Sequence, residues 1–267
     1  MSHERFDNYE EEYEVNSSEV FPNSTVKDIY FQVRFPNLFY LDTRLAGEFQ
    51  LGIMSRFPKS QLVVQKQLIV ANMEPGRKLE DVPEASTRKI WKFQSDAGYE
   101  LELASDSLSL HSSHHNSYAN GDPDRRFRDL IDFGLTSFLK VVKVPFFDRI
   151  GLRYVDRCPV ESRSTRTFYR WYDSCLPCHR FPIENLDAAA VTVVRKLDDD
   201  YHLTYQEKLN TDSGALLLEI DIDAWHMDVK PDGFLATTDV LHKLCAEEFW
   251  HTAKRPLLDY MRRKPGK

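Results

Sequence analysis

Apolar and polar residues alternate in several short segments of this chain, which is the pattern of strands with one buried face. Segment 27–35 is the clearest case, because every second residue is apolar: Ile29, Phe31, Val33 and Phe35. Similar patterns predict strands over 61–70, 87–94, 99–103, 108–111, 147–157, 188–196, 201–208 and 215–223. Most of the turns between them are too short for parallel crossovers, so we expect antiparallel meanders.

Three stretches place apolar residues at helical spacing. The first follows the N-cap candidate Asp42-Thr43 and stops at Pro58. The second is predicted to start at 122–124, and its wide apolar stripe must lie on a sheet. The third is predicted to be capped by 237–239 and kinked at Pro256, whereas 158–186 has an irregular pattern. We therefore predict an α+β fold, with antiparallel β-meanders packed against long α-helices.

The two halves of the chain share an outline of strand, turn, strand, turn, strand and long helix. The segment that starts at Gly98 and precedes the second helix is similar to the segment that starts at Gly214 and precedes the third. This pattern predicts one domain over 25–264, built from two structurally similar halves at about 25–144 and 145–264.

Charge is distributed unevenly along the sequence. The net charge is −7, and residues 1–20 account for −6 of it, so residues 1–24 are predicted to form a disordered acidic leader. The N-terminus lacks the apolar run of a secretory signal, and no segment has the length and hydropathy of a membrane span. We therefore expect a cytoplasmic protein without membrane contact, with reduced cysteines and no cofactor.

The string Pro145-Phe-Phe-Asp-Arg-Ile-Gly-Leu-Arg-Tyr-Val-Asp-Arg157 resembles the most characteristic stretch of a sporadically distributed family of uncharacterised bacterial proteins. In that family a similar Phe-x-Arg-hydrophobic-Gly-Leu-Arg-Tyr motif opens the second half. Asp156 stands where the family usually has Asn. The resemblance implies an accessory or mobile-element gene, as in defence or toxin–antitoxin loci, and it implies no catalytic residues.

Arg149 and Arg153 lie four residues apart on the strand predicted from this string, so both face the same side, about 13 Å apart. Two fixed guanidinium groups suit recognition of phosphate or carboxylate. Alternatively, they form ion pairs with Asp148, with Asp156, or with the strand that carries Asp221 and Asp223. Gly151 between them permits close approach of another group.

A basic and aromatic stretch follows the string. Arg166 and Arg170 interleave here with aromatic residues that include Trp171 and Tyr172. Arginine beside aromatic rings is typical of single-strand nucleic-acid surfaces and also of protein-binding hot spots. A third interpretation is a connector that packs its rings on the core.

The motif Cys175-Leu-Pro-Cys178-His179 is the sharpest local motif. With Cys158 it would supply the four ligands of a structural zinc site, but a second CxxC is missing. A redox pair is a further alternative, and loop cysteines without a role remain the simplest interpretation.

Three functional hypotheses follow. The leading hypothesis is a non-enzymatic binding or accessory module that contacts a protein partner, because nucleotide-binding and hydrolase motifs are missing from the sequence. The second is an RNA or single-stranded DNA binder that uses Arg149, Arg153, Arg166 and Arg170. The third is a metal-dependent enzyme built on Asp221, Asp223 and the histidines. The sequence leaves the oligomeric state open.

Overall fold

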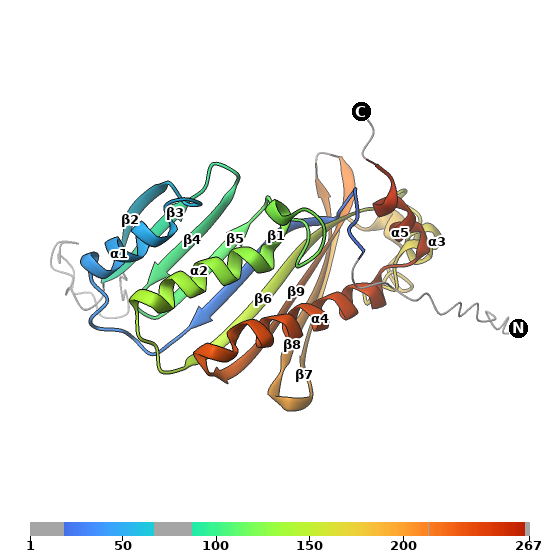
Figure 1. Cartoon of the computed structure of the whole chain (residues 1–267). Helices are drawn as coiled ribbons and strands as arrows, with labels where there is room; N and C mark the ends of the chain where they lie inside the picture. The colour runs from blue at the N-terminus through green and yellow to red at the C-terminus, as the bar shows by residue number, and fades with distance from the viewer. Residues whose placement is uncertain (1–18, 67–86, 213, 265–267) are drawn as a thin grey trace, which may run out of the picture.

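A nine-stranded antiparallel sheet organises the chain in the computed structural model, which describes residues 19–66, 87–212 and 214–264 (Figure 1). The strand order is β2-β3-β4-β5-β1-β6-β9-β8-β7, so β1 and β6 are neighbours at its centre. The strands are β1 (Val26–Arg34), β2 (Lys59–Lys66), β3 (Thr87–Gln94), β4 (Tyr99–Ala104), β5 (Ser107–Ser112), β6 (Phe147–Pro159), β7 (Ala188–Lys196), β8 (His202–Asp212) and β9 (Ala215–Val229). The predicted α+β class and antiparallel pairing are confirmed.

The helices are α1 (Thr43–Ile53), α2 (Phe127–Val141), α3 (Thr165–Trp171), α4 (Phe234–Thr252) and α5 (Arg255–Arg262). Helices α1, α2 and α4 lie on one face of the sheet, and α3 and α5 gather at one end of it (Figure 1). We call the face beneath α1, α2 and α4 the covered face.

The core lies between these helices and the sheet, and it follows the alternation in the sequence. Ile29, Phe31 and Val33 of β1 are fully buried on the covered face. Phe138 of α2 packs its ring on two other phenylalanines, Phe35 and Phe49, with centroid separations of 5.3 and 5.9 Å. Burial of such side chains contributes about 1.5–3 kcal/mol each, so the covered face supplies most of the hydrophobic stabilisation.

Each predicted strand corresponds to a strand of the sheet. The residues that end these elements have the backbone conformations or hydrogen bonds expected of them. Gly98 has a φ of +87° at the end of the turn between β3 and β4, which is the left-handed conformation that glycine adopts without strain. The predicted N-cap of α1 is also confirmed, since the Asp42 carboxylate accepts a hydrogen bond from the Leu45 amide at 2.9 Å. The predicted strand 61–70 is β2, and its last four residues lie outside the described ranges.

Several predicted helix boundaries are wrong. The helix expected to start at 122–124 is a 3₁₀ turn there, and α2 begins only at Phe127 because Arg126 has extended backbone angles. Helix α4 begins at Phe234, three residues before the predicted cap. Thr238 donates instead to the Phe234 carbonyl within the helix, at 2.7 Å. The expected kink at Pro256 is a break between α4 and α5, where Ala253 is extended and proline occupies the first turn of α5.

The end of the predicted leader is part of the folded structure. Glu19 accepts two hydrogen bonds from the Arg262 guanidinium, both at 2.8 Å, and Phe21 is buried against the Trp250 ring. The Asn23 amide also donates to the Met261 carbonyl at 3.0 Å. The boundary at residue 24 therefore lies too far along the chain, while residues 1–18 lie outside the described ranges. Every helix within the described ranges is too short or too polar to cross a membrane.

Candidate functional site

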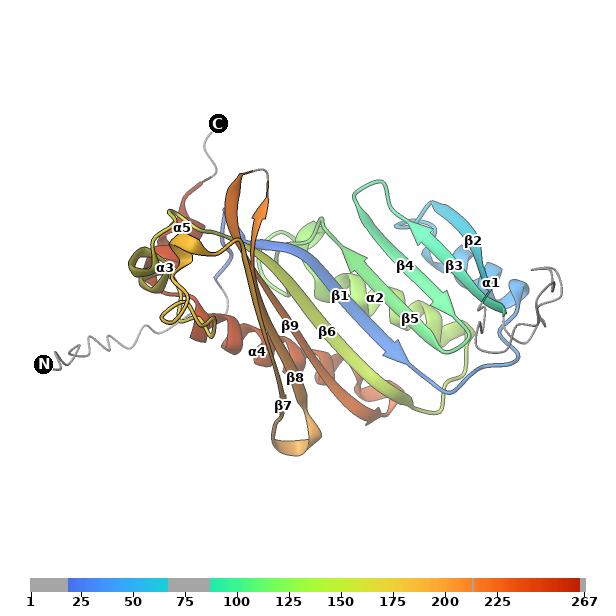
Figure 2. The ribbon, with the colours of Figure 1, turned by 180° about the vertical axis from the view of Figure 1, so that it is seen from behind.

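Polar side chains cover the sheet face opposite the helices, which no helix of the described residues crosses (Figure 2). Because side chains alternate along a strand, the same strands that bury apolar residues present polar ones here. We call this the uncovered face. Its central residues are Asp28, Tyr30, Gln32 and Arg34 of β1, Glu100 and Glu102 of β4, Ser109 and His111 of β5, Arg149, Gly151 and Arg153 of β6, and Asp221, Asp223 and Trp225 of β9.

Both predicted arginines of β6 lie on this face and both form ion pairs with β9. Arg153 donates to the two carboxylate oxygens of Asp221, at 2.7 and 2.6 Å. Arg149 donates to Asp223 at 2.9 Å. The alternative that placed these arginines against the Asp221/Asp223 strand is therefore confirmed, and each guanidinium group is fixed in orientation.

Aromatic rings hold the same guanidinium groups from the sides. The Arg153 guanidinium lies over the Tyr30 ring at 5.4 Å, and Tyr30 stacks on His111 with centroids 4.5 Å apart. The Arg149 guanidinium lies 5.2 Å from the Trp225 ring. Cation–π contacts of this kind contribute about 0.5–1 kcal/mol at exposed sites, so they position the arginines more than they stabilise the fold.

Gly151 lines a groove in the middle of the uncovered face. It pairs with Gln32 on one side and Trp225 on the other, and a Cβ atom at this position would lie 2.8 Å from Arg149 Nη1. Glycine therefore leaves room for the Arg149 side chain to fold across the strand. The resulting groove has a volume of about 540 Å³.

The groove lining is electrically balanced. It contains three arginines and three carboxylates, namely Arg34, Arg149, Arg153, Glu100, Glu102 and Asp223. Burial raises the pKa of Asp223, against the opposing effect of Arg149 and Arg153, and the hydrogen bond to Asp221 raises the pKa of Arg153. Arg34 differs from the other two arginines, since it donates to Gln32 at 3.0 Å and has no carboxylate partner in the described part of the chain.

The other predicted binding residues lie on α3, in the stretch expected to be irregular. Its N-cap is Ser164, whose hydroxyl accepts a hydrogen bond from the Thr167 amide. The apolar periodicity of the sequence did not predict this helix. Arg166 and Arg170 are exposed on this helix, whereas Trp171 is half-buried and donates to Glu161 at 3.0 Å. Tyr172 does not belong to an exposed binding surface, because it is 1% exposed and its hydroxyl donates to the Pro159 carbonyl; its ring packs on the core, as in the third interpretation.

The four candidate zinc ligands are not arranged as a site. Cys158 and Cys178 are buried and Cys175 and His179 are exposed, with the His179 ring stacked on Tyr169 at 4.0 Å. Within the described ranges no three or more His, Cys, Asp or Glu side chains are grouped so that they could hold a metal ion.

Comparisons with protein-family models, with curated proteins and with solved structures found no match. The uncovered face is therefore interpreted from its own geometry.

The sequence indicated Arg149, Arg153 and Gly151, with Asp221 and Asp223 among the possible partners, but it did not indicate the neighbouring residues from β1 and β9 that complete the surface. The sequence pattern showed only that certain strand residues alternate with the buried apolar ones, and these include Tyr30, Arg34 and Trp225. Their place beside β6 depends on the pairing of β1 with β6 and of β6 with β9, which local periodicity does not specify.

Proposed function

We propose that the chain is a non-enzymatic binding module that docks a protein partner on the uncovered face. The observation that carries this proposal is the groove over Gly151, where arginines held by ion pairs and aromatic rings lie on a sheet face that no described helix covers. Arginine and aromatic residues in a partly desolvated depression are the composition of protein-binding hot spots.

Charge balance favours a protein partner over a nucleic acid. Nucleic-acid affinity requires an excess of cations facing the phosphates, whereas the groove has equal numbers of arginines and carboxylates. Mixed charge with rings between is typical of protein interfaces, where opposite charges set register and specificity. Arg34 indicates which kind of side chain the partner supplies. Of the three arginines that line the groove, it is the one that forms no ion pair with a carboxylate of the described chain. We expect the partner to supply an acidic side chain to it.

Affinity purification of the full tagged chain from its native host, with quantitative mass spectrometry, tests the proposal. Arg34→Ala should reduce the recovered partner at least tenfold, because the intermolecular ion pair is lost. The matched control is the double variant Arg166→Ala, Arg170→Ala, which removes two exposed arginines from α3 and should leave recovery unchanged. Full recovery with Arg34→Ala, together with loss in the α3 variant, would move the partner site to α3.

A nucleic-acid role for α3 is the alternative, and one observation favours it. Arg166 and Arg170 are four residues apart on a helix, so they project on the same side, and neither has an ion-pair partner in the described chain. A fluorescent single-stranded RNA of mixed sequence is the probe. This alternative predicts binding that weakens steeply with added salt and is lost in the Arg166→Ala, Arg170→Ala variant.

We further propose that the two halves of the chain derive from one structural unit. Strands β3, β4, β5 and β1 lie in that order from one side, and β7, β8, β9 and β6 lie in the matching order from the other, which supports the proposal. Helices α2 and α4 each follow the last strand of their half. Superposition of β1 and β3–α2 on β6 and β7–α4 in an experimental structure should align the central strands and both helices.

The family and the compartment are also proposals. Membership of the sporadically distributed bacterial family rests on the 145–157 string, and it would be tested by finding a toxin or nuclease gene beside the gene for this chain. A cytoplasmic location is supported by four cysteines that form no disulfide. Fractionation of the native host should recover the chain with cytoplasmic markers.

A further inference from the structure

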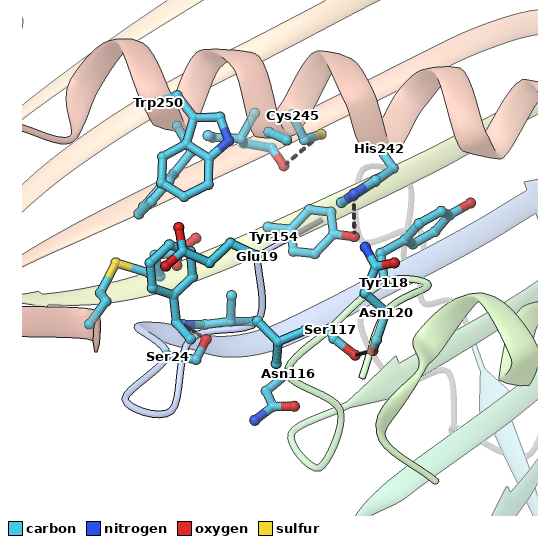
Figure 3. Close-up of a pocket in the computed structure, with 18 residues that line it drawn as sticks. Glu19, Ser24, Asn116, Ser117, Tyr118, Asn120, Tyr154, His242, Cys245 and Trp250 are labelled. Atoms are coloured by element: carbon cyan, nitrogen blue, oxygen red, sulfur yellow. Dashed lines mark hydrogen bonds between the residues drawn. The ribbon is translucent and has the colours of Figure 1, made fainter. Parts of the chain in front are cut away.

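A cavity of about 120 Å³ lies on the helix side of the sheet, away from the groove of the uncovered face (Figure 3). Segment 19–26, loop 116–120, strands β6 and β9 and helices α4 and α5 enclose it. Most of its walls are apolar, and they include Phe21, Val26, Ile222, Phe249 and Met261. Protein cores contain few voids larger than one water molecule, so a cavity of this size is unusual for a structural core.

The cavity is accessible from outside through a wider cleft of about 580 Å³ between loop 118–120 and α4. Five residues line both spaces, which makes the cavity the inner end of the cleft: Tyr118, Asn120, His242, Ala246 and Trp250. A small molecule could therefore reach the inner space along α4.

Polar side chains gather at the cleft end of the cavity, where Figure 3 places Tyr118, Asn120 and His242 together. The His242 ring stacks on Tyr118 at 4.0 Å, and its Nδ1 lies 3.0 Å from the Tyr154 hydroxyl. If that hydroxyl donates, the proton of neutral His242 is on Nε2, which makes no hydrogen bond in the described chain. The buried Trp250 Nε1, further along α4, also makes none within the described residues.

Burial disfavours the charged forms of the titratable groups inside the cavity. Burial lowers the pKa of His242 to about 4, so its ring is neutral. Asp156 is 3% exposed and accepts from Thr25 at 2.8 Å, and burial raises its pKa to about 7. Glu19 at the opposite end is held by Arg262. Since an unpaired charge is costly to desolvate, an uncharged occupant is favoured over an ion.

We propose that this cavity binds a small uncharged aromatic molecule with one hydroxyl group, whose ring lies among the apolar walls and whose hydroxyl meets His242 and Asn120. A dry cavity of about 150 Å³ holds benzene in another protein, so the smaller cavity here suits a single six-membered ring whose hydroxyl extends to the space shared with the cleft. The ring would occupy the end lined by Phe21 and Phe249. The hydroxyl would accept from His242 Nε2, in the arrangement typical of small-molecule pockets with few, convergent polar groups.

A ¹⁹F NMR titration of the full chain with 4-fluorophenol tests the proposal. We expect saturable binding with a Kd of about 1 mM or tighter, displaced by phenol. Benzoate and benzylammonium have the same ring with a charged group, and neither should displace the probe at neutral pH. Absence of saturable binding up to about 5 mM, or equal displacement by the charged compounds, would overturn the proposal.

Two variants locate the probe. Ala246→Leu fills the space that the cavity and the cleft share, and it should weaken 4-fluorophenol binding at least tenfold. The control is Ala236→Leu, an exposed position on the same helix, which should leave binding unchanged. Binding that survives Ala246→Leu in a folded protein would place the probe elsewhere.

His242→Phe keeps a ring against Tyr118 but removes the hydrogen bond donor. It should weaken 4-fluorophenol binding severalfold while fluorobenzene binding is retained. An equal loss for both probes would contradict the assigned contact, and this comparison is informative even where Ala246→Leu fails to fold.

Discussion

The two faces of the sheet differ in the surroundings that they give to buried acidic side chains. On the covered face, Asp156 is almost fully buried, forms no ion pair within the described chain, and has its pKa raised to about 7 by burial. On the uncovered face, Asp221 is nearly as buried but receives two hydrogen bonds from Arg153. The carboxyl group on the covered face thus has no cation beside it in the described chain and its pKa is raised by burial, whereas Arg153 supplies a cation to Asp221 on the uncovered face.

This difference bears on the proposal that a protein partner docks on the uncovered face. Fully buried rings of the covered face cannot change partners without opening the core, whereas groove residues that contact water can exchange hydrogen bonds with another molecule. Substitutions on the covered face should therefore change stability. Substitutions on the uncovered face should change binding.

The largest effect on stability is expected for Phe138→Ala. Phe138 is fully buried between Phe35 and Phe49, so its removal leaves a cavity and should lower the free energy of unfolding by about 3–5 kcal/mol. Urea denaturation followed by circular dichroism measures this. Leu51→Ala is the matched control, because Leu51 is 71% exposed on α1 and its truncation should cost less than about 0.5 kcal/mol. Equal effects of the two variants would contradict the described core.

The next largest effect is expected for Asp156→Asn, and it depends on pH. The folded carboxyl group has a pKa of about 7, above the value near 3.9 of an unfolded aspartate, so the folded state binds the extra proton between these values. The contribution of Asp156 to the free energy of unfolding, measured as the wild type minus the Asp156→Asn variant, should therefore fall by about 3 kcal/mol as pH rises from about 4 to 7.

Asparagine keeps the oxygen that accepts from Thr25 and has no proton to lose. The Asp156→Asn variant should therefore lack this pH dependence and should exceed the wild type in stability above pH 7. Asp173→Asn, at an exposed carboxyl group, serves as the control and should follow the wild type. A difference in stability between the wild type and Asp156→Asn that does not change over this pH range would contradict the raised pKa of Asp156.

The periodicity of the sequence was sufficient to predict the strands and their faces, because alternation is a local property that burial enforces along each strand. The start of α2 was not predictable, since it depends on the extended backbone of Arg126. The Arg126 guanidinium donates two hydrogen bonds to the Gly121 carbonyl, a contact that the local sequence pattern does not reveal. The partnership of Arg153 with Asp221 was one of several open alternatives. It depends on strand pairing between residues 68 positions apart. The cavity beside α4 could not be predicted from the sequence, because the residues of loop 116–120 have no pattern that indicates which helix the loop packs against.

The smallest effect on stability is expected for Arg34→Ala, which should also have a clear effect on binding. Arg34 is exposed and forms no ion pair in the described chain, so the free energy of unfolding should change by less than about 0.5 kcal/mol. Partner affinity should fall at least tenfold in the same protein. Urea denaturation and affinity purification of one preparation of Arg34→Ala measure the free energy of unfolding and the partner affinity. A large loss of stability in this variant would contradict the expectation that substitutions on the uncovered face change binding and leave stability unchanged.

The most direct test of the central claim is site-specific photo-crosslinking in the native host. A photoreactive amino acid placed at Gln32, in the groove, should form a covalent adduct with a protein partner, and the adduct should disappear when Arg34→Ala is added. The same group at Leu51 on α1 should form no such adduct. Adducts from Leu51 or from Arg166 on α3, with none from Gln32, would contradict the assignment of the uncovered face as the binding surface.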